Sequence, residues 1–210
     1  MVAVEGKATT ISKEKKEKGK IPSYLIYETL DGIPVYYKGY REVLGKTKTF
    51  EEIMAYGDLQ AIFLTYIRNY LQSALGKEYF IIQGETGVHV GHKTNPSLDL
   101  CIFLARQISL KNAANKYFEI APQAVIEVDT KADVQFFEQE SGSNYFIKKT
   151  KKLLEFGVKE VVWFFTQDEK IMVAHPNQPW LTVDWKDEIE VMGHRFSIEK
   201  VIQESEAASE

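Results

Sequence analysis

The pattern of apolar and polar residues changes sharply near Pro22. Residues 1–20 are polar, rich in Lys and Glu, and without apolar periodicity, so they are predicted to form a disordered tail. From residue 24 to residue 40 strand-forming aromatic residues flank an Asp31-Gly32 turn signal, which predicts an N-terminal hairpin. A short helix is predicted over residues 50–57.

The clearest helix is predicted over residues 58–75, where apolar residues recur at helical spacing between a capping Asp58 and a terminating Gly76. Two more amphipathic helices are predicted, over 143–156 and, with Ser197 as its cap, over 196–206. Apolar runs predict six strands, over residues 79–83, 86–90, 97–105, 123–129, 159–167 and 170–176. A further hairpin is expected over residues 181–193. Helices alternating with strands indicate an α/β (α+β) fold, a mixed central sheet flanked by helices.

The length favours one domain, placed over residues 21–203 and followed by a frayed acidic end at 204–210. The composition, 44% hydrophobic and 27% charged, is ordinary for a globular protein, and a net charge of −4 argues against a strong nonspecific coat on nucleic acid. The single cysteine, Cys101, lies in an apolar run and is expected to be buried, which favours a reducing compartment. Without a secretory signal or a long apolar run, we expect no membrane segment and a cytoplasmic location.

Two acids interrupt apolar strands. Asp99 stands in the run SLDLCIFLA, and Glu127 stands in QAVIEVD. Ionised carboxylates are rarely placed in buried strands unless they are paired or bind a metal, so a shared divalent cation with oxygen ligands is one explanation. The alternative is that both acids lie at strand ends, where solvent or Arg and Lys side chains compensate their charge.

Other polar residues keep alternatives open. Asp129 would share the face of Glu127 if the strand continues, as a further ligand, as a partner for Lys131, or as a solvated strand end. The lysines of the 143–156 helix, including Lys148 and Lys149, form a solvated face by periodicity, and only a helix that crosses the acidic strands would make one catalytic. The four histidines lack zinc-ligand spacing.

Several landmarks, taken in order, resemble the Uma2 family, whose members are proposed endonucleases. They are the element YETLDG at residues 27–32, a helix with Gln60 in its first turn, Pro96 ahead of Asp99, the strand AVIEV, and KKTKKLLEFGVKEVVW. The similarity runs from about Tyr24 to about Ile202. It implies a restriction-endonuclease-like, PD-(D/E)XK core.

The resemblance also implies site residues. Asp99 matches the Asp of PD and Glu127 the acid of (D/E)XK, and both, with the carbonyl of Val128, would hold Mg²⁺, for which Mn²⁺ is the expected substitute. Pro96 and Asp99 are not adjacent, and Asp129 occupies the usual lysine position. Lys149 falls where the family has a lysine on the following helix, with Lys148 and Lys131 as alternatives. Glu28 matches the family's N-terminal Glu, a catalytic residue that would approach the metal or its water, and Gln60 is a further candidate.

Three functional hypotheses follow. The first is a Mg²⁺-dependent phosphodiester hydrolase that acts on DNA, in which a homodimer would supply two active sites. The second is a nuclease fold that has lost catalysis and serves as a binding module. The third is an interaction protein whose surface includes Tyr36, Tyr37 and Tyr40, although packing of these tyrosines on the core is favoured. The substrate sequence is not predicted.

Overall fold

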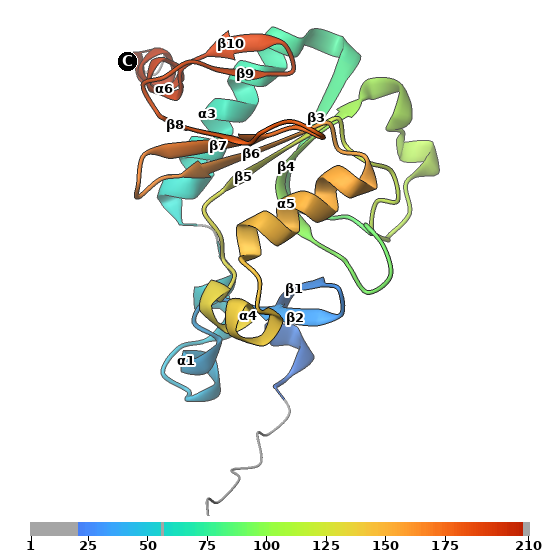
Figure 1. Ribbon diagram of the computed structural model, residues 1–210, viewed down its shortest axis with the longest axis vertical. Coiled ribbons are helices and arrows are strands. Elements are labelled where there is room, and N and C mark those ends of the chain that lie inside the picture. Colours follow the sequence, from blue (N-terminus) through green and yellow to red (C-terminus); the bar gives the residue numbers. More distant parts are fainter. Residues whose placement is uncertain (1–20, 56, 208–210) are drawn as a thin grey trace, which may run out of the picture.

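A six-stranded mixed sheet forms the centre of the computed structural model, which describes residues 21–55 and 57–207 (Figure 1). The strand order is β3-β4-β5-β6-β7-β8; β5 and β6 are parallel, and the other neighbours are antiparallel. Their bounds are Tyr79–Gly87 (β3), Ser97–Leu104 (β4), Ala124–Val128 (β5), Glu160–Phe165 (β6), Lys170–Ala174 (β7) and Leu181–Asp184 (β8). The predicted mixed sheet is confirmed.

Helices cover both faces of this sheet. The long α3 (Asp58–Leu75) and the terminal α6 (Ile198–Ala207) lie on one face, next to the hairpin of β9 (Ile189–Val191) and β10 (His194–Phe196). On the other face lies α5 (Tyr145–Phe156). Every residue of β5 is buried, because alternate side chains enter the two core layers, which explains why its sequence is apolar apart from Glu127. Cys101 is buried in this core, as predicted.

A smaller lobe packs beside the sheet at the end of α5 (Figure 1). It contains the predicted hairpin, β1 (Ile26–Leu30) and β2 (Ile33–Tyr36), and the helices α1 (Tyr40–Leu44), α2 (Phe50–Met54) and α4 (Val134–Ser141). Tyr36, Tyr37 and Tyr40 are buried in the core of this lobe, so the core-packed reading of these tyrosines is confirmed. Single 3₁₀ turns occupy Ser23–Leu25, Gly76–Glu78, Ala105–Gln107 and Leu110–Asn112.

The structure differs from the sequence-based expectation in several elements. The two strands expected on either side of Gly84 are one strand, β3, whose register shifts between Gln83 and Thr86 in a bulge-like irregularity. Helices α1 and α4 were not predicted. The hairpin expected over 181–193 does not form, because β8 pairs with β7 in the central sheet and β9 pairs with β10. Helix α3 is capped by Gly57, and Asp58 is its first residue. Helix α6 continues to Ala207, beyond residue 203, where the ordered domain was expected to end. The predicted tail, 1–20, lies outside the described residues.

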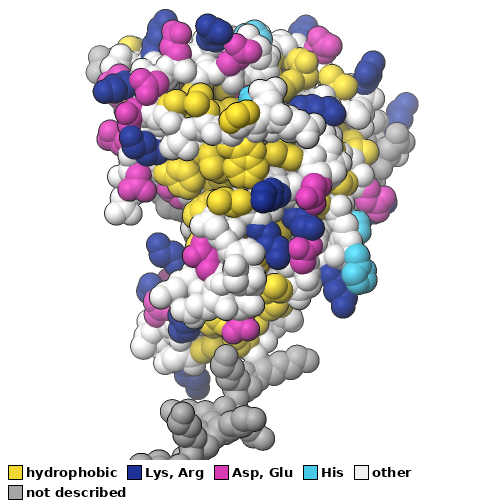
Figure 2. Space-filling model, in the orientation of Figure 1, with side chains coloured by type: hydrophobic (Ala, Val, Ile, Leu, Met, Phe, Trp, Pro, Cys, Tyr) yellow, Lys and Arg dark blue, Asp and Glu magenta, His cyan; other side chains and the backbone are white. Residues whose placement is uncertain are grey.

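The surface mixes both signs of charge. Figure 2 shows apolar side chains over the middle of the visible face, with Lys and Arg among Asp and Glu around them. None of the helices in the described part of the chain has the length and apolarity needed to cross a membrane.

Candidate functional site

The two acids that interrupt the apolar strands lie side by side at one end of the sheet. Leu100 pairs with Ile126 across β4 and β5, which places Asp99 and Glu127 one step further along the same antiparallel pair. The backbone amide of Val128 donates a hydrogen bond of 2.9 Å to Oδ2 of Asp99. Both carboxylates are buried, with exposed fractions of 3% and 2%. The sheet therefore brings together the two residues that were singled out separately.

Lys149 reaches this pair from the helix that covers the sheet. Its Nζ lies 3.2 Å from Oε1 of Glu127 and 3.1 Å from Oε2 of Glu28, and it donates to the carbonyl oxygen of Ser97 at 2.8 Å. The whole residue is buried, at 0% exposure. Helix α5 thus crosses the acidic strands, which is the condition under which one of its lysines joins the site.

Glu28 enters the cluster from the N-terminal hairpin. Its Oε1 accepts a hydrogen bond of 2.8 Å from the hydroxyl of Tyr145, and its Oε2 accepts one of 3.0 Å from the backbone amide of Ser97. Sequence reasoning did not single out Tyr145. The available signal was its position one helical turn before Lys149, which puts both side chains on the same face of α5.

Burial and opposite charge act together on this cluster. Burial raises the pKa of Glu127 well above its usual value, although the ammonium group of Lys149 lowers it in part. Burial lowers the pKa of Lys149, but the carboxylates of Glu127 and Glu28 outweigh burial and hold that pKa above its usual value. The ammonium group also lies 5.5 Å from the ring centre of Trp163 and 5.8 Å from that of Tyr27. Lys149 is therefore a buried cation held by several partners.

Two oxygen atoms on the other side of Asp99 share one hydrogen-bond donor, the side-chain amide of Gln60. The side-chain nitrogen of Gln60 donates to the carbonyl oxygen of Val128 at 2.7 Å and to Oδ2 of Asp99 at 3.4 Å, so the two oxygens converge on one point. Oε1 of Glu127 is buried and, although it faces Lys149, has no hydrogen-bond partner. Two carboxylates and one carbonyl fit the chemistry of Mg²⁺, which prefers oxygen ligands and retains several waters.

These ligands are few. Among the described residues no group of three or more His, Cys, Asp and Glu side chains is arranged to hold a metal ion. A cation here would thus depend on the Val128 carbonyl and on water as well as on the two carboxylates.

Three of the alternative residues, Asp129, Lys131 and Lys148, contact residues outside the cluster. Asp129 has a left-handed backbone, with φ of 52°, and its carboxylate accepts hydrogen bonds from the amide and hydroxyl of Thr166. Lys131 pairs with Glu85 at 2.5 Å, and Lys148 pairs with Asp31 at 3.3 Å. Of the three candidate lysines, Lys149 is the one that pairs with Glu127 and Glu28.

No protein-family model matches this sequence, and no curated protein matches it. Among solved structures, the chain is similar to a protein from Anabaena variabilis described as a "putative nuclease belonging to DUF820". The TM-score is 0.59 at 14% sequence identity, and the match covers 84% of this chain and 89% of that chain. The two proteins share a fold.

This likeness confirms the expected fold class and its resemblance to the family once designated DUF820 and now called Uma2. At 14% identity the likeness shows the fold alone, and the description as a "putative nuclease" applies to the neighbour. The roles of Asp99, Glu127, Lys149 and Glu28 remain predictions, which the geometry above supports.

Proposed function

We propose that this protein is a metal-dependent phosphodiester hydrolase that acts on DNA. The observation that carries the proposal is the convergence of three elements on one point. Strands β4 and β5 contribute Asp99 and Glu127, and α5 contributes Lys149, whose Nζ lies 3.2 Å from Oε1 of Glu127. Carboxylates that bind a cation, beside a fixed ammonium group, are suited to stabilising the charge of phosphoryl transfer.

Asp99, Glu127 and the carbonyl oxygen of Val128 would hold Mg²⁺ or Mn²⁺. When bound, such an ion lowers the pKa of a coordinated water and offsets negative charge on a phosphoryl oxygen. The protein's own contribution is the placement of its ligands, because the hydrogen bond from the Val128 amide fixes Oδ2 of Asp99.

Lys149 supplies a positive charge that does not depend on the metal. Its ammonium group would stabilise the negative charge that grows on the phosphoryl oxygens during attack. Glu28 and the carbonyl of Ser97 hold that group in position, at 3.1 Å and 2.8 Å. Tyr145 in turn fixes Glu28 through its hydroxyl. Glu28 and Tyr145 are accordingly positioning residues in this proposal.

Nicking of supercoiled plasmid DNA with Mg²⁺ or Mn²⁺ tests the proposal. We expect Asp99→Asn and Glu127→Gln, which keep the size of each side chain, to reduce the nicking rate at least about a hundredfold. The matched control is Glu160→Gln, because Glu160 is another buried carboxylate in a strand of the same sheet, and it takes no part in this cluster. It should nick at the rate of the wild type.

Two results would refute the hydrolase. One is that wild type and Asp99→Asn nick DNA equally, and the other is that purified wild type nicks neither plasmid nor single-stranded DNA with either metal. Thermal unfolding of each variant establishes that a loss of nicking does not reflect a loss of folded protein.

A catalytically inactive binding module is the second candidate, and one observation favours it. The amide of Gln60 occupies the point on which the Asp99 and Val128 oxygens converge, and it satisfies both without a cation. Calorimetric titration with Mn²⁺ separates the two functions. The hydrolase requires binding that Glu127→Gln abolishes, whereas absence of binding to the folded wild type favours the inactive module.

A hydrolase that cuts both strands of a duplex needs two active sites, and we propose a homodimer as the form that supplies them. Sedimentation equilibrium, with and without a short duplex, measures the oligomeric state. A protein that cuts both strands while remaining monomeric on the duplex would contradict this assembly.

A further inference from the structure

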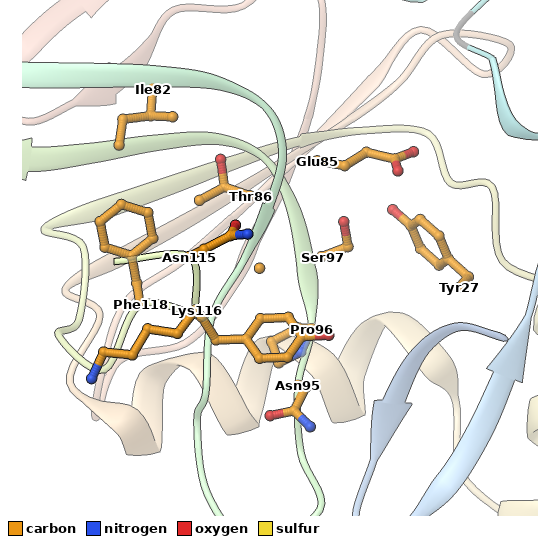
Figure 3. A pocket seen from close by; sticks show the side chains of 12 residues that line it. Tyr27, Ile82, Glu85, Thr86, Asn95, Pro96, Ser97, Asn115, Lys116 and Phe118 are labelled. Carbon is orange, nitrogen blue, oxygen red and sulfur yellow. The ribbon is translucent and has the colours of Figure 1, made fainter. Parts of the chain in front are cut away.

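A groove of about 750 Å³ opens beside the buried cluster. The end of β3, the start of β4 and the segment that connects β4 to β5 form its walls (Figure 3). Tyr27, Glu85 and Ser97 line it on the side of the cluster, and Asn95, Asn115 and Tyr117 line the rest. The mechanism proposed above makes no use of these last three residues.

The groove and the cluster share a wall. The amide of Ser97 donates to Glu28 and its carbonyl accepts from Lys149, so the backbone of one groove residue contacts two members of the cluster. The ring of Tyr27, which also lines the groove, lies 5.8 Å from Nζ of Lys149. Ser97 and Tyr27 therefore form the wall between the groove and Lys149.

Tyr117 is held at the groove by its neighbour. Phe118 forms a parallel bridge with Val88, where its amide donates to Gly87 at 3.0 Å and its carbonyl accepts from His89 at 2.8 Å. The ring of Phe118 stacks on that of Phe103, with centroids 5.1 Å apart, which anchors the segment to the core. Tyr117 itself remains 53% exposed.

Gly87 makes room for the ring of Tyr117. A Cβ atom at Gly87 would lie 2.2 Å from Cδ1 and 2.3 Å from Cε1 of Tyr117, so the ring packs directly against the glycine backbone. The Cδ1–Cε1 edge of the ring is thus fixed against the backbone of Gly87. An aromatic ring that is fixed along one edge and remains half exposed offers a platform on which another ring can stack.

Amide side chains surround this platform. Figure 3 shows the amides of Asn95 and Asn115 at the groove, with the hydroxyl of Tyr27 on its far side. A hydrogen bond of 2.6 Å joins Oδ1 of Asn95 to Nδ1 of His89 and fixes the orientation of that amide. An aromatic face combined with amide donors and acceptors is the set of groups that recognises a nucleobase, by stacking and by contacts to its edge.

We propose that this groove binds one unstacked nucleobase, stacked on Tyr117, from a nucleotide next to the scissile phosphate. The inference rests on the proposed function and specifies its substrate class. A base inside a duplex has both faces covered by its neighbours, so the groove accepts a single strand or a locally opened strand in preference to an intact duplex.

Binding of a short single-stranded oligonucleotide with a central 2-aminopurine, with Ca²⁺ replacing Mg²⁺, tests the groove. Stacking quenches the fluorescence of this base. We expect the wild type to quench it and to bind the strand more tightly than the matching duplex. Tyr117→Leu should weaken binding to the strand about fivefold or more and abolish quenching, whereas Tyr117→Phe should retain both. Gly87→Ala, which displaces the ring without removing it, should behave like Tyr117→Leu.

Tyr24→Leu is the matched control, because Tyr24 is 54% exposed, lies outside the groove, and should bind as the wild type does. The proposed base-binding role of the groove would be overturned if wild type and Tyr117→Leu bound and quenched equally. It would also be overturned if the wild type preferred the duplex and did not quench the fluorescence. If the wild type nevertheless nicks plasmid in either of these cases, the proposed hydrolase activity is supported and the proposed base binding is not. Binding that depends on Tyr117 in a protein that nicks nothing supports the groove and counts against the hydrolase. A wild type that neither binds nor nicks overturns both.

Discussion

Lys149 is a fully buried cation beside two buried carboxylates, those of Glu127 and Glu28. Removing one partner of a buried ion pair leaves the others without compensation, which costs more than the pair itself contributes. We expect Lys149→Met to lower the free energy of unfolding at neutral pH by about 3–5 kcal/mol. Urea unfolding measures this change.

Lys152→Met provides the comparison. Lys152 lies on the same helix and pairs with Asp31 at 3.0 Å, but its side chain is 30% exposed. Water screens this pair, so its loss should cost less than about 1 kcal/mol. If the two variants lost equal stability, the cluster around Lys149 would not be the dry, charge-compensated site described here.

Glu160 is a second buried acid, and its pH dependence can be predicted in sign. Burial raises its pKa above the usual 4.5, and the Met192 amide, which donates to Oε2 at 2.9 Å, offsets this only in part. The folded state thus binds the proton more tightly than the unfolded state. The stability that this acid contributes is complete below about pH 4.5 and is lost as the pH rises through the raised pKa.

Glu160→Gln removes this titration. We expect the variant to gain stability relative to the wild type as the pH rises from 4.5 to 8, with the difference levelling off above the raised pKa. Urea unfolding at several pH values measures it. A stability difference that is constant across that range would show that the carboxyl group is not titrating in this way.

The sequence reveals a site residue only where a local pattern marks it, and not where contacts with distant residues place it. Asp99 and Glu127 are visible because an acid within an apolar strand has few physical explanations. Lys149 is not visible from periodicity, since four lysines of its helix look alike, and only the family resemblance favoured it. Tyr145 and Ser97 act through partners far away in the sequence, and Ser97 acts through its backbone, so no local pattern marks them.

At the scale of elements, long and strongly periodic segments were predicted well and short ones were not. Helices α3 and α5 and the core strands carry enough apolar residues to define a period. Helix α4 has one buried residue, Phe137, and depends on capping, since Asp133 accepts from the amide of Phe136 at 2.9 Å. Gly84 was predicted to separate two strands, but β3 continues through it with a shift of register between Gln83 and Thr86.

The C-terminal end of α5 provides a test of what terminates this helix. Gly157 terminates the helix with φ of 116°, a conformation that side chains with a Cβ atom rarely adopt. A Cβ there would meet Ala121 at 3.5 Å, an ordinary contact, so the cost of Gly157→Ala comes from the backbone alone. We expect a loss of about 1–3 kcal/mol by urea unfolding.

Gly91→Ala is the control for this prediction. Nothing lies within 4 Å of a Cβ at Gly91, and its backbone is outside the left-handed region, so its stability should change by less than about 0.5 kcal/mol. Equal effects of the two substitutions would show that the backbone at Gly157 is not under this constraint.

At the scale of the whole molecule, charge limits how the protein meets a polyanion. The net charge is −4, and the face in Figure 2 carries both signs. Several lysines near the site are already paired: Lys131 with Glu85, Lys148 and Lys152 with Asp31, and Lys116 with Glu119. The predicted activity on DNA thus has to rely on a few local contacts rather than on a broad basic surface.

This balance predicts a weak dependence of DNA binding on salt. Each phosphate that a Lys or Arg neutralises releases counterions and adds about −0.9 to the slope of log K against log salt concentration. Because most nearby lysines already form ion pairs with acidic residues, we expect only about two to four such phosphate contacts and a slope of roughly −2 to −4. Fluorescence anisotropy across a range of salt concentrations measures it. A slope of about −6 or steeper would reveal a basic surface that these ion pairs do not suggest, and the protein would then hold its substrate mainly by charge rather than through the groove at Tyr117.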